Sequence, residues 1–218
     1  MDFVVMGAGA VGGYFGARLA QAGHDVTFVA RGDHLRELQA SGLQLRSALG
    51  DLHLPSVRAV ADPGPIGDAD VVLFTVKAQQ SESVARKLLP LVGEHSRVLT
   101  LQNGVDGVAL LERMFGPERV WGGVAYLEAV VSAPGRITHT SPFARIVFGP
   151  LTGSDARAEQ ALVTFRDAGI ETTLAADPLE AVWRKWVLIC AFSGLTALTR
   201  KPIGDVLAQP ETRELFRG

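Results

Sequence analysis

Residues 2–12 read DFVVMGAGAVG, an apolar run that leads straight into a glycine-rich turn. The run at 2–6 predicts a buried strand, and the small residues from Ala10 to Gln21 predict a helix that ends before Gly23. The run DVTFVA at 25–30 predicts a second strand. A glycine-rich turn between a strand and a helix, with another strand close behind, is typical of a dinucleotide-binding unit.

The turn matches the pattern G-x-G-x-x-G and supplies six candidate cofactor-binding residues: Gly7, Ala8, Gly9, Ala10, Val11 and Gly12. The first glycine permits the tight turn, the second lets the backbone approach a pyrophosphate, and the third lets helix and strand pack closely. The N-terminus of the helix adds free amides and a partial positive charge. The alternative interpretation is a glycine turn that binds nothing.

The rest of the first 175 residues continues this alternation. Strands are predicted at 71–76 and 97–102, and helices at 34–40, with Asp33 as the N-cap, and at 81–89. Short strands separated by proline and glycine are then predicted at 119–124, 126–131, 136–140 and 144–149. One more helix is predicted at 156–168. This pattern predicts an α/β fold with a Rossmann-type doubly wound parallel sheet and an antiparallel extension.

A long apolar helix is expected after Asp177-Pro178, from Leu179 to Thr199, interrupted or bent near Ser193-Gly194. We therefore divide the chain into an NADP-binding Rossmann domain at 1–175 and the beginning of an all-α substrate or dimerisation domain at 176–218. One long helix cannot bury its own apolar stripe. It would pack on the first domain, on another subunit, as in a homodimer, or against a natural chain that continues further. The ending ETRELFRG has no clear terminator, which favours the last.

Composition and charge argue against several classes of function. The 218 residues carry 21 Lys and Arg against 23 Asp and Glu, a net charge of −2, which argues against a nucleic-acid partner. No apolar run is expected to reach the roughly 20 residues of a membrane span, and the N-terminus lacks a basic leader, so we expect no membrane partner and a cytoplasmic location. The five histidines lack ligand spacing, which predicts no metal, and His139 is interpreted as structural. Cys190 lies in an apolar run and is predicted to be a buried reduced thiol.

The residue after the second strand bears on the choice of cofactor. NAD-binding proteins usually carry Asp or Glu there, whereas this chain has Ala30-Arg31-Gly32. A guanidinium can pair with a 2′-phosphate, so Arg31 predicts NADPH over NADH, the alternative being an exposed solubilising charge. Lys77 and Asn103 follow later strands, at the edge of such a sheet where ligands bind. The alternatives for these two are a capping lysine and an Asn-Gly turn.

The long helix opens with Trp183-Arg184-Lys185-Trp186. A lysine beside two tryptophans is expected to lose part of its hydration, which lowers its pKa and makes it a usable proton donor. Reduction of a ketone requires such a donor for the forming alkoxide. The alternative is a lysine whose stem covers the tryptophans while its amine reaches water. The residues alone leave both interpretations open.

These motifs, in this order, resemble those of the ketopantoate reductases (2-dehydropantoate 2-reductases). The resemblance covers essentially the whole chain and rests on GAGAVG, VTFVARG, TVKA, LQNG, PGRITH and VWRKWVLICAFSGLTALTRKPIGDVL. It implies that Lys185 is the catalytic acid, that Asn103 contacts cofactor and substrate, and that Lys77 helps to hold NADPH. Ala129 matches a position near the nicotinamide.

The chain departs from the family at the positions that bind substrate. Characterised members carry asparagines four and eight residues after the lysine and a third further on, where this chain has Ile189, Ser193 and Ile203. Isoleucine forms no side-chain hydrogen bond, so only the short hydroxyl of Ser193 remains as a candidate substrate contact. The resemblance therefore implies the reaction class, with a substrate that differs in its polar contacts.

We predict an NADPH-dependent reductase of a 2-oxo acid, either ketopantoate in pantothenate biosynthesis or a related ketone. Lys185 would donate the proton, and Asn103 and Ser193 would orient the substrate. One alternative is a non-catalytic NADP-binding protein with a regulatory or redox-sensing role. Another is an enzyme similar to 6-phosphogluconate or 3-hydroxy-acid dehydrogenases, whose lysine usually follows an asparagine, whereas this one follows Trp-Arg.

Overall fold

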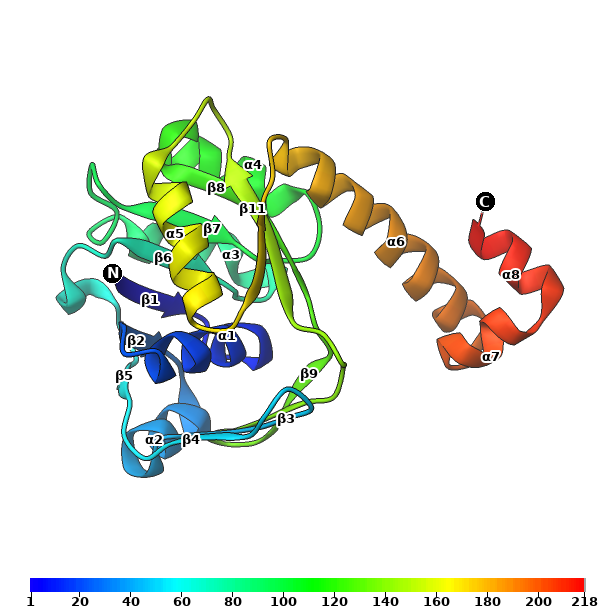
Figure 1. Cartoon of the computed structure of the whole chain (residues 1–218), viewed down its shortest axis with the longest axis horizontal. Coiled ribbons are helices and arrows are strands. Elements are labelled where there is room, and N and C mark those ends of the chain that lie inside the picture. Colours follow the sequence, from blue (N-terminus) through cyan, green and yellow to red (C-terminus); the bar gives the residue numbers. More distant parts are fainter. Residues whose placement is uncertain (218) are drawn as a thin grey trace.

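The computed structural model describes residues 1–217, and it has a central eight-stranded sheet with the strand order β12-β11-β8-β7-β6-β1-β2-β5. Every neighbouring pair in this sheet is parallel except β8 and β11, which run antiparallel. The fold is therefore the predicted Rossmann-type doubly wound sheet (Figure 1). The strands are β1 (Asp2–Met6), β2 (Asp25–Val29), β5 (Arg58–Val60), β6 (Val71–Phe74), β7 (Arg97–Thr100), β8 (Val120–Tyr126), β11 (Arg145–Pro150) and β12 (Glu171–Leu174).

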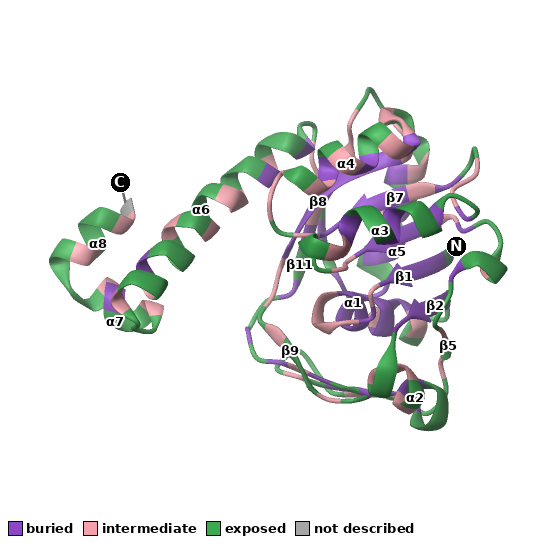
Figure 2. Ribbon diagram, turned by 180° about the vertical axis from the view of Figure 1, so that it is seen from behind, coloured by how far each residue is buried: buried purple, intermediate pink, exposed green. Residues whose placement is uncertain are grey.

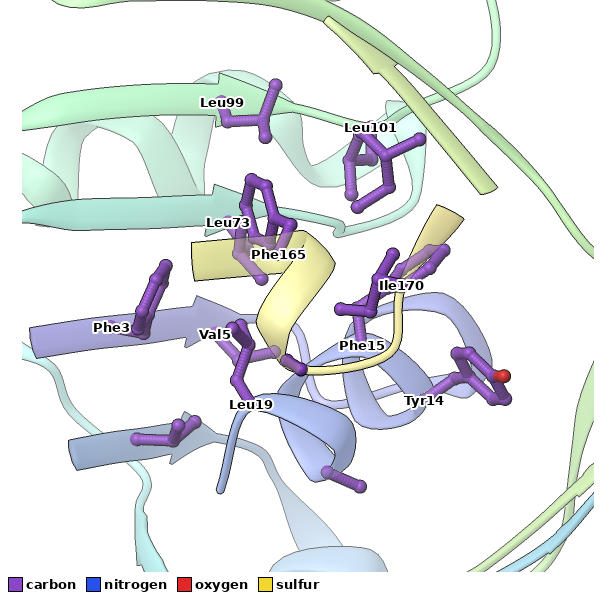
Figure 3. Packing of buried hydrophobic residues seen from close by; sticks show 14 of the residues in the cluster. Phe3, Val5, Tyr14, Phe15, Leu19, Leu73, Leu99, Leu101, Phe165 and Ile170 are labelled. Atoms are coloured by element: carbon purple, nitrogen blue, oxygen red, sulfur yellow. The ribbon is translucent and has the colours of Figure 1, made fainter. Parts of the chain in front are cut away.

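Apolar side chains on both faces of the sheet hold its helices. Alternate residues of β1 point to opposite faces, so Phe3 and Val5 belong to one core cluster, and Val4 and Met6 to another. The first cluster packs the sheet against α1 and α5, with Phe15, Leu19 and Phe165 in its centre (Figure 3). The second packs it against α3 and α4. These helices are α1 (Ala10–Gln21), α3 (Ser81–Ala85), continued by a 3-10 turn at Arg86–Leu88, α4 (Asp106–Phe115) and α5 (Ala156–Asp167).

A second sheet of four strands, in the order β4-β3-β10-β9, corrects part of the sequence prediction. Its strands are β3 (Leu43–Ser47), β4 (Leu52–Leu54), β9 (Ala129–Ala133) and β10 (Arg136–His139). We expected the segments at 126–131 and 136–140 to extend the main sheet. They turn away from it instead, because β10 pairs in parallel with β3, a strand that the sequence analysis missed. Buried Leu43, Leu45 and Ile137 then pack this sheet into the first core cluster beside α1.

The helix α2 (Gly32–Ser41) differs from the prediction at its N-terminus. Its N-cap is Arg31, and no side chain accepts a hydrogen bond there. Asp33 lies within the first turn and pairs with Arg36, so the expected cap by Asp33 was wrong. Arg31 thus stands at the junction of β2 and α2.

The C-terminal part is helical and extends away from the sheets (Figures 1 and 2). It consists of α6 (Pro178–Thr199), α7 (Ile203–Ala208) and α8 (Pro210–Arg217). Asp177 caps α6 by accepting from the amide of Glu180 at 3.0 Å, as expected. The expected interruption near Ser193-Gly194 is absent, since α6 continues to Thr199. The Ser193 hydroxyl donates to the carbonyl of Ile189 one turn earlier, a bond of the kind that often bends helices.

Two further expectations about α6 need correction. Cys190, which lies in α6, is exposed rather than buried. The helix also has 22 residues, and an 18-residue window of it has a mean hydropathy of 1.3, which by length and composition alone suffices for a membrane span. The expectation that no apolar run is long enough was therefore wrong. The first turns of α6 pack on β8 through Val182, so this end of the helix belongs to the folded domain. Gly218 lies outside the described residues.

Candidate active site

The glycine-rich loop joins β1 to α1. Close neighbours exclude a side chain at Gly7 and at Gly12, whereas Gly9 faces open space. Gly7 has φ +103, and a Cβ there would lie 2.9 Å from a methyl group of Val76. A Cβ on Gly12 would lie 2.3 Å from the Thr75 hydroxyl, so only glycine lets α1 pack this closely. A Cβ on Gly9 would meet nothing within 4 Å. The space beside Gly9 is therefore open for a ligand to approach the backbone.

The N-terminus of α1 is left without a side-chain cap. Its N-cap residue is Gly9, and the first bond into the helix runs from the Gly13 amide to the Gly9 carbonyl at 2.7 Å. The amides of Ala10, Val11 and Gly12 precede that bond and have no partner within the helix. Together with the helix dipole they form a site for an anion such as a phosphate.

A cavity of about 620 Å³ opens beside this loop, and basic side chains line it. Arg31, Lys77 and Lys87 all contribute to its wall, and among the described lining residues there is no carboxylate. Arg31 donates a hydrogen bond to the side-chain oxygen of Gln80 at 2.8 Å, which orients its guanidinium at the mouth. The size, the uncapped helix and the positive lining fit a dinucleotide that carries phosphates.

A second cavity, of about 370 Å³, shares Thr75, Val76 and Lys77 with the first. Asn103 and Lys185 also line it, so the structure brings together three residues that the sequence analysis selected from distant segments. Gln102, which also lines this cavity, holds its wall in place by donating to the Val76 carbonyl at 2.7 Å and to the Ser81 hydroxyl at 2.8 Å. The two cavities therefore meet at the carboxyl ends of β6 and β7, the edge where ligands bind in such sheets.

Lys185 is the titratable group in this second cavity with a strongly altered acidity. Its ammonium donates to the carbonyl oxygen of Ala125 and lies 5.3 Å from the centre of the Tyr126 ring. Burial lowers the pKa of Lys185 from 10.5 to about 8. We expected the two neighbouring tryptophans to desolvate this lysine, and of these Trp183 is 54% exposed whereas Trp186 is half-buried. The fold desolvates the amine by packing α6 on β8.

Four predicted site residues line neither cavity: Ser193, Ala129, Ala10 and Gly12. Ser193 is exposed on α6, two turns beyond Lys185, which at 1.5 Å per residue is about 12 Å along the helix. Its hydroxyl donates to the Ile189 carbonyl at 2.5 Å. Ala129 begins β9, is half-buried and does not line either cavity. Ala10 and Gly12 line neither cavity, although their neighbours Gly9 and Val11 do.

Several lining residues escaped the sequence analysis. Gln80 and Lys87 follow Lys77 on the short helical segment after β6, where a helix-like spacing could have suggested a shared face. His34 lines the first cavity and contacts the glycine-rich loop, but nothing in its local sequence signals this role. Within residues 1–217 no group of three His, Cys, Asp or Glu side chains is arranged to hold a metal ion.

Comparison with known proteins agrees with the class that the fold and the site define, a Rossmann-type oxidoreductase. The family model described as ketopantoate reductase PanE/ApbA matches residues 3–153, and the model of its C-terminal domain matches residues 177–218. A 2-dehydropantoate 2-reductase of Mesorhizobium japonicum is 33% identical over 100% of this chain and 73% of its own length. The uncharacterized oxidoreductase YkpB of Bacillus subtilis is 32% identical over 95% of this chain and 68% of its own length. The chain belongs to the ketopantoate reductase PanE/ApbA family.

Solved structures show the same relationship. The crystal structure of 2-dehydropantoate 2-reductase from Geobacter metallireducens superposes with a TM-score of 0.93 at 36% identity, covering 99% of this chain and 71% of that one. A ternary complex of D-mandelate dehydrogenase with NADH and anilino(oxo)acetate superposes with a TM-score of 0.90 at 19% identity, covering 99% and 70%. The second likeness shows a shared fold.

Proposed function

We propose that this protein is an NADPH-dependent reductase of a 2-oxo acid. The observation that carries the proposal is the meeting of Lys77, Asn103 and Lys185 in one cavity that adjoins the phosphate-binding loop. The relatives named above as 2-dehydropantoate 2-reductases support the same reaction.

The residues of the first cavity fit NADPH. The free amides at the start of α1 would hold the pyrophosphate, and the open side of Gly9 leaves room for it. Arg31 would pair with the 2′-phosphate, and Lys77 and Lys87 add positive charge to the same wall. Bound NADPH would supply the hydride for the reduction.

The residues of the second cavity provide the acid and the polar contacts. The Lys185 ammonium would protonate the oxygen of the ketone as negative charge develops on it. Asn103 can donate and accept hydrogen bonds at the same time, which suits a group placed between cofactor and substrate. The lining contains two lysines and no carboxylate among the described residues, so it suits an anionic 2-oxo acid.

The substrate that we propose is ketopantoate or a 2-oxo acid with fewer hydrogen-bonding groups. Ile189 lies one turn beyond Lys185 and offers no polar contact, and the Ser193 hydroxyl is engaged within α6. Relatives that use asparagine at both positions would bind hydroxyl groups more tightly. We also propose a cytoplasmic location without nucleic-acid or membrane partners, and the net charge of −2 supports the part that concerns nucleic acid.

The test is the oxidation of NADPH, followed by absorbance, with ketopantoate and a panel of 2-oxo acids of increasing polarity. We expect turnover with at least one member and faster turnover with apolar side chains than with hydroxylated ones. Tight binding of NADPH without turnover on any member would overturn the proposal and favour the non-catalytic NADP-binding alternative.

A further inference from the structure

His34 joins two distant parts of the chain through its two ring nitrogens. Its Nε2 lies 2.7 Å from the carbonyl oxygen of Ala8, in the glycine-rich loop. Its Nδ1 accepts a hydrogen bond from the amide of Gly135 at 3.0 Å. These partners are 26 and 101 residues away in the sequence, so the bridge exists only in the folded chain.

The partners of His34 determine its protonation state. A backbone amide can only donate and a carbonyl oxygen can only accept. Nδ1 must therefore be unprotonated to accept from Gly135, and Nε2 must carry the hydrogen that goes to Ala8. The bridge requires the neutral ring in this one tautomer.

On the loop side, the bridge holds the peptide group between Ala8 and Gly9. The carbonyl oxygen of this peptide faces His34, and its amide donates to the Gly7 carbonyl at 2.7 Å. Both ends of one peptide plane are thus held. Rotation of this plane would exchange the directions of the oxygen and the N–H, which would change the charges that the loop offers to a phosphate.

On the other side, the bridge holds the turn between β9 and β10. Gly135 has φ +69, and its carbonyl accepts from the Gln44 amide of β3 at 2.8 Å. A Cβ at Gly135 would lie 2.6 Å from the side chain of Glu37 on α2, so the turn packs closely against that helix. Val131 of the adjoining strand β9 lines the first cavity. His34 therefore connects the glycine-rich loop to the second sheet, and both line the first cavity.

We propose that His34 is a positioning residue, which holds the glycine-rich loop in the conformation that binds phosphate and acts through the Ala8 carbonyl. This inference rests on the proposed binding of NADPH. It assigns no contact between His34 and the reacting atoms.

The two bonds can be separated by substitution. In His34→Gln the side-chain amide can reach the position of Nε2 and donate to Ala8, whereas in His34→Asn the shorter side chain can accept from Gly135 only. His34→Leu removes both bonds. We expect the Kd for NADPH to rise about tenfold in His34→Leu and His34→Asn and to return to within about twofold in His34→Gln. The matched control is Gln39→Leu on the same helix, which removes a bond to the Ala59 carbonyl at 2.9 Å and should leave the Kd unchanged.

Thermal unfolding of the same variants separates positioning from stability. A purely structural role would lower Tm in all three His34 variants without the difference in Kd between glutamine and asparagine, and that result would overturn the inference. Nitrogen chemical shifts of the His34 ring should show Nε2 protonated and Nδ1 unprotonated at neutral pH, and the opposite tautomer would also contradict it. Unchanged Kd in His34→Leu would overturn this inference alone, whereas wild-type protein that binds neither NADPH nor NADH would overturn the proposed function as well.

Discussion

The Nζ of Lys185 on α6 donates a hydrogen bond to the carbonyl oxygen of Ala125 on β8, a residue 60 positions earlier in the chain. This contact ties the helical C-terminal part to the Rossmann sheet at the point where the second cavity opens. It also removes water from one side of an ammonium group. The position and the acidity of the proposed proton donor thus have the same structural cause.

Substitution of Lys185 tests its role. Lys185→Met keeps the apolar stem and removes the ammonium, so we expect kcat for the reduction to fall by about 10²–10⁴-fold while the Kd for NADPH stays the same. The neighbouring Arg184→Ala serves as the control, because Arg184 is exposed and its ion pair within residues 1–217 is with Glu180 at 3.5 Å. Steady-state kinetics and a binding titration would measure both constants. A methionine variant with wild-type kcat would contradict the assignment.

The pH dependence of the reduction follows from the pKa of about 8 that burial gives Lys185. The ammonium is the proton donor, and it is present below this pH and lost above it. We therefore expect kcat/KM to be level near neutral pH and to decline about tenfold per pH unit above about 8. Initial rates measured between about pH 6 and about pH 10 would show this decline. A rate that stays level up to about pH 9.5 would rule out Lys185 as the donor.

The same pKa predicts a change in folding stability. Between about pH 8 and pH 10.5 the unfolded chain holds a proton on Lys185 that the folded chain has released. The unfolded state binds more protons there, so the free energy of unfolding should rise with pH across this window. Urea unfolding of wild-type protein and Lys185→Met would isolate the contribution, because the variant lacks it. Equal pH dependence in both proteins would contradict the prediction.

Two alanine substitutions in the loop should have opposite consequences. In Gly9→Ala the new methyl group meets no protein atom, so the fold should keep its Tm while the Kd for NADPH rises at least about tenfold. In Gly12→Ala the methyl group would lie 2.3 Å from the Thr75 hydroxyl and 2.5 Å from the Gly7 carbonyl. That overlap should destabilise the fold by about 1–3 kcal/mol. Thermal unfolding and NADPH titration of both variants distinguish the cases, and unchanged NADPH affinity in Gly9→Ala would contradict the proposed phosphate site.

The sequence predicted the elements that carry strong local signals. β1, α1 and β2 lie where the apolar runs and glycines placed them, because short buried strands and a glycine turn are determined by adjacent residues. β3, β4 and β5 were missed, since they are short and mix polar with apolar residues, as Gln44 and His53 illustrate. The second sheet depends on pairing between β3 and β10, which lie about 90 residues apart and leave no local pattern.

The site was predicted to a similar extent. Arg31, Lys77 and Asn103 were selected because each follows a predicted strand, and Lys185 because of its apolar helix, and the structure places all four in the cavity walls. The desolvation of Lys185 was predicted, but its contact with Ala125 was not, because that contact is tertiary. The bridge through His34 could not be read from local spacing, since its partners are backbone groups whose sequence identity carries no information.

The central claim is that the loop and Arg31 bind NADPH, and parallel titrations of the protein with NADPH and NADH test it most directly. We expect NADPH to bind with a Kd at least about tenfold lower than that of NADH, and Arg31→Gln to remove most of this difference by weakening NADPH alone. Binding of neither dinucleotide, or equal affinity for both in the wild-type protein, would contradict the account.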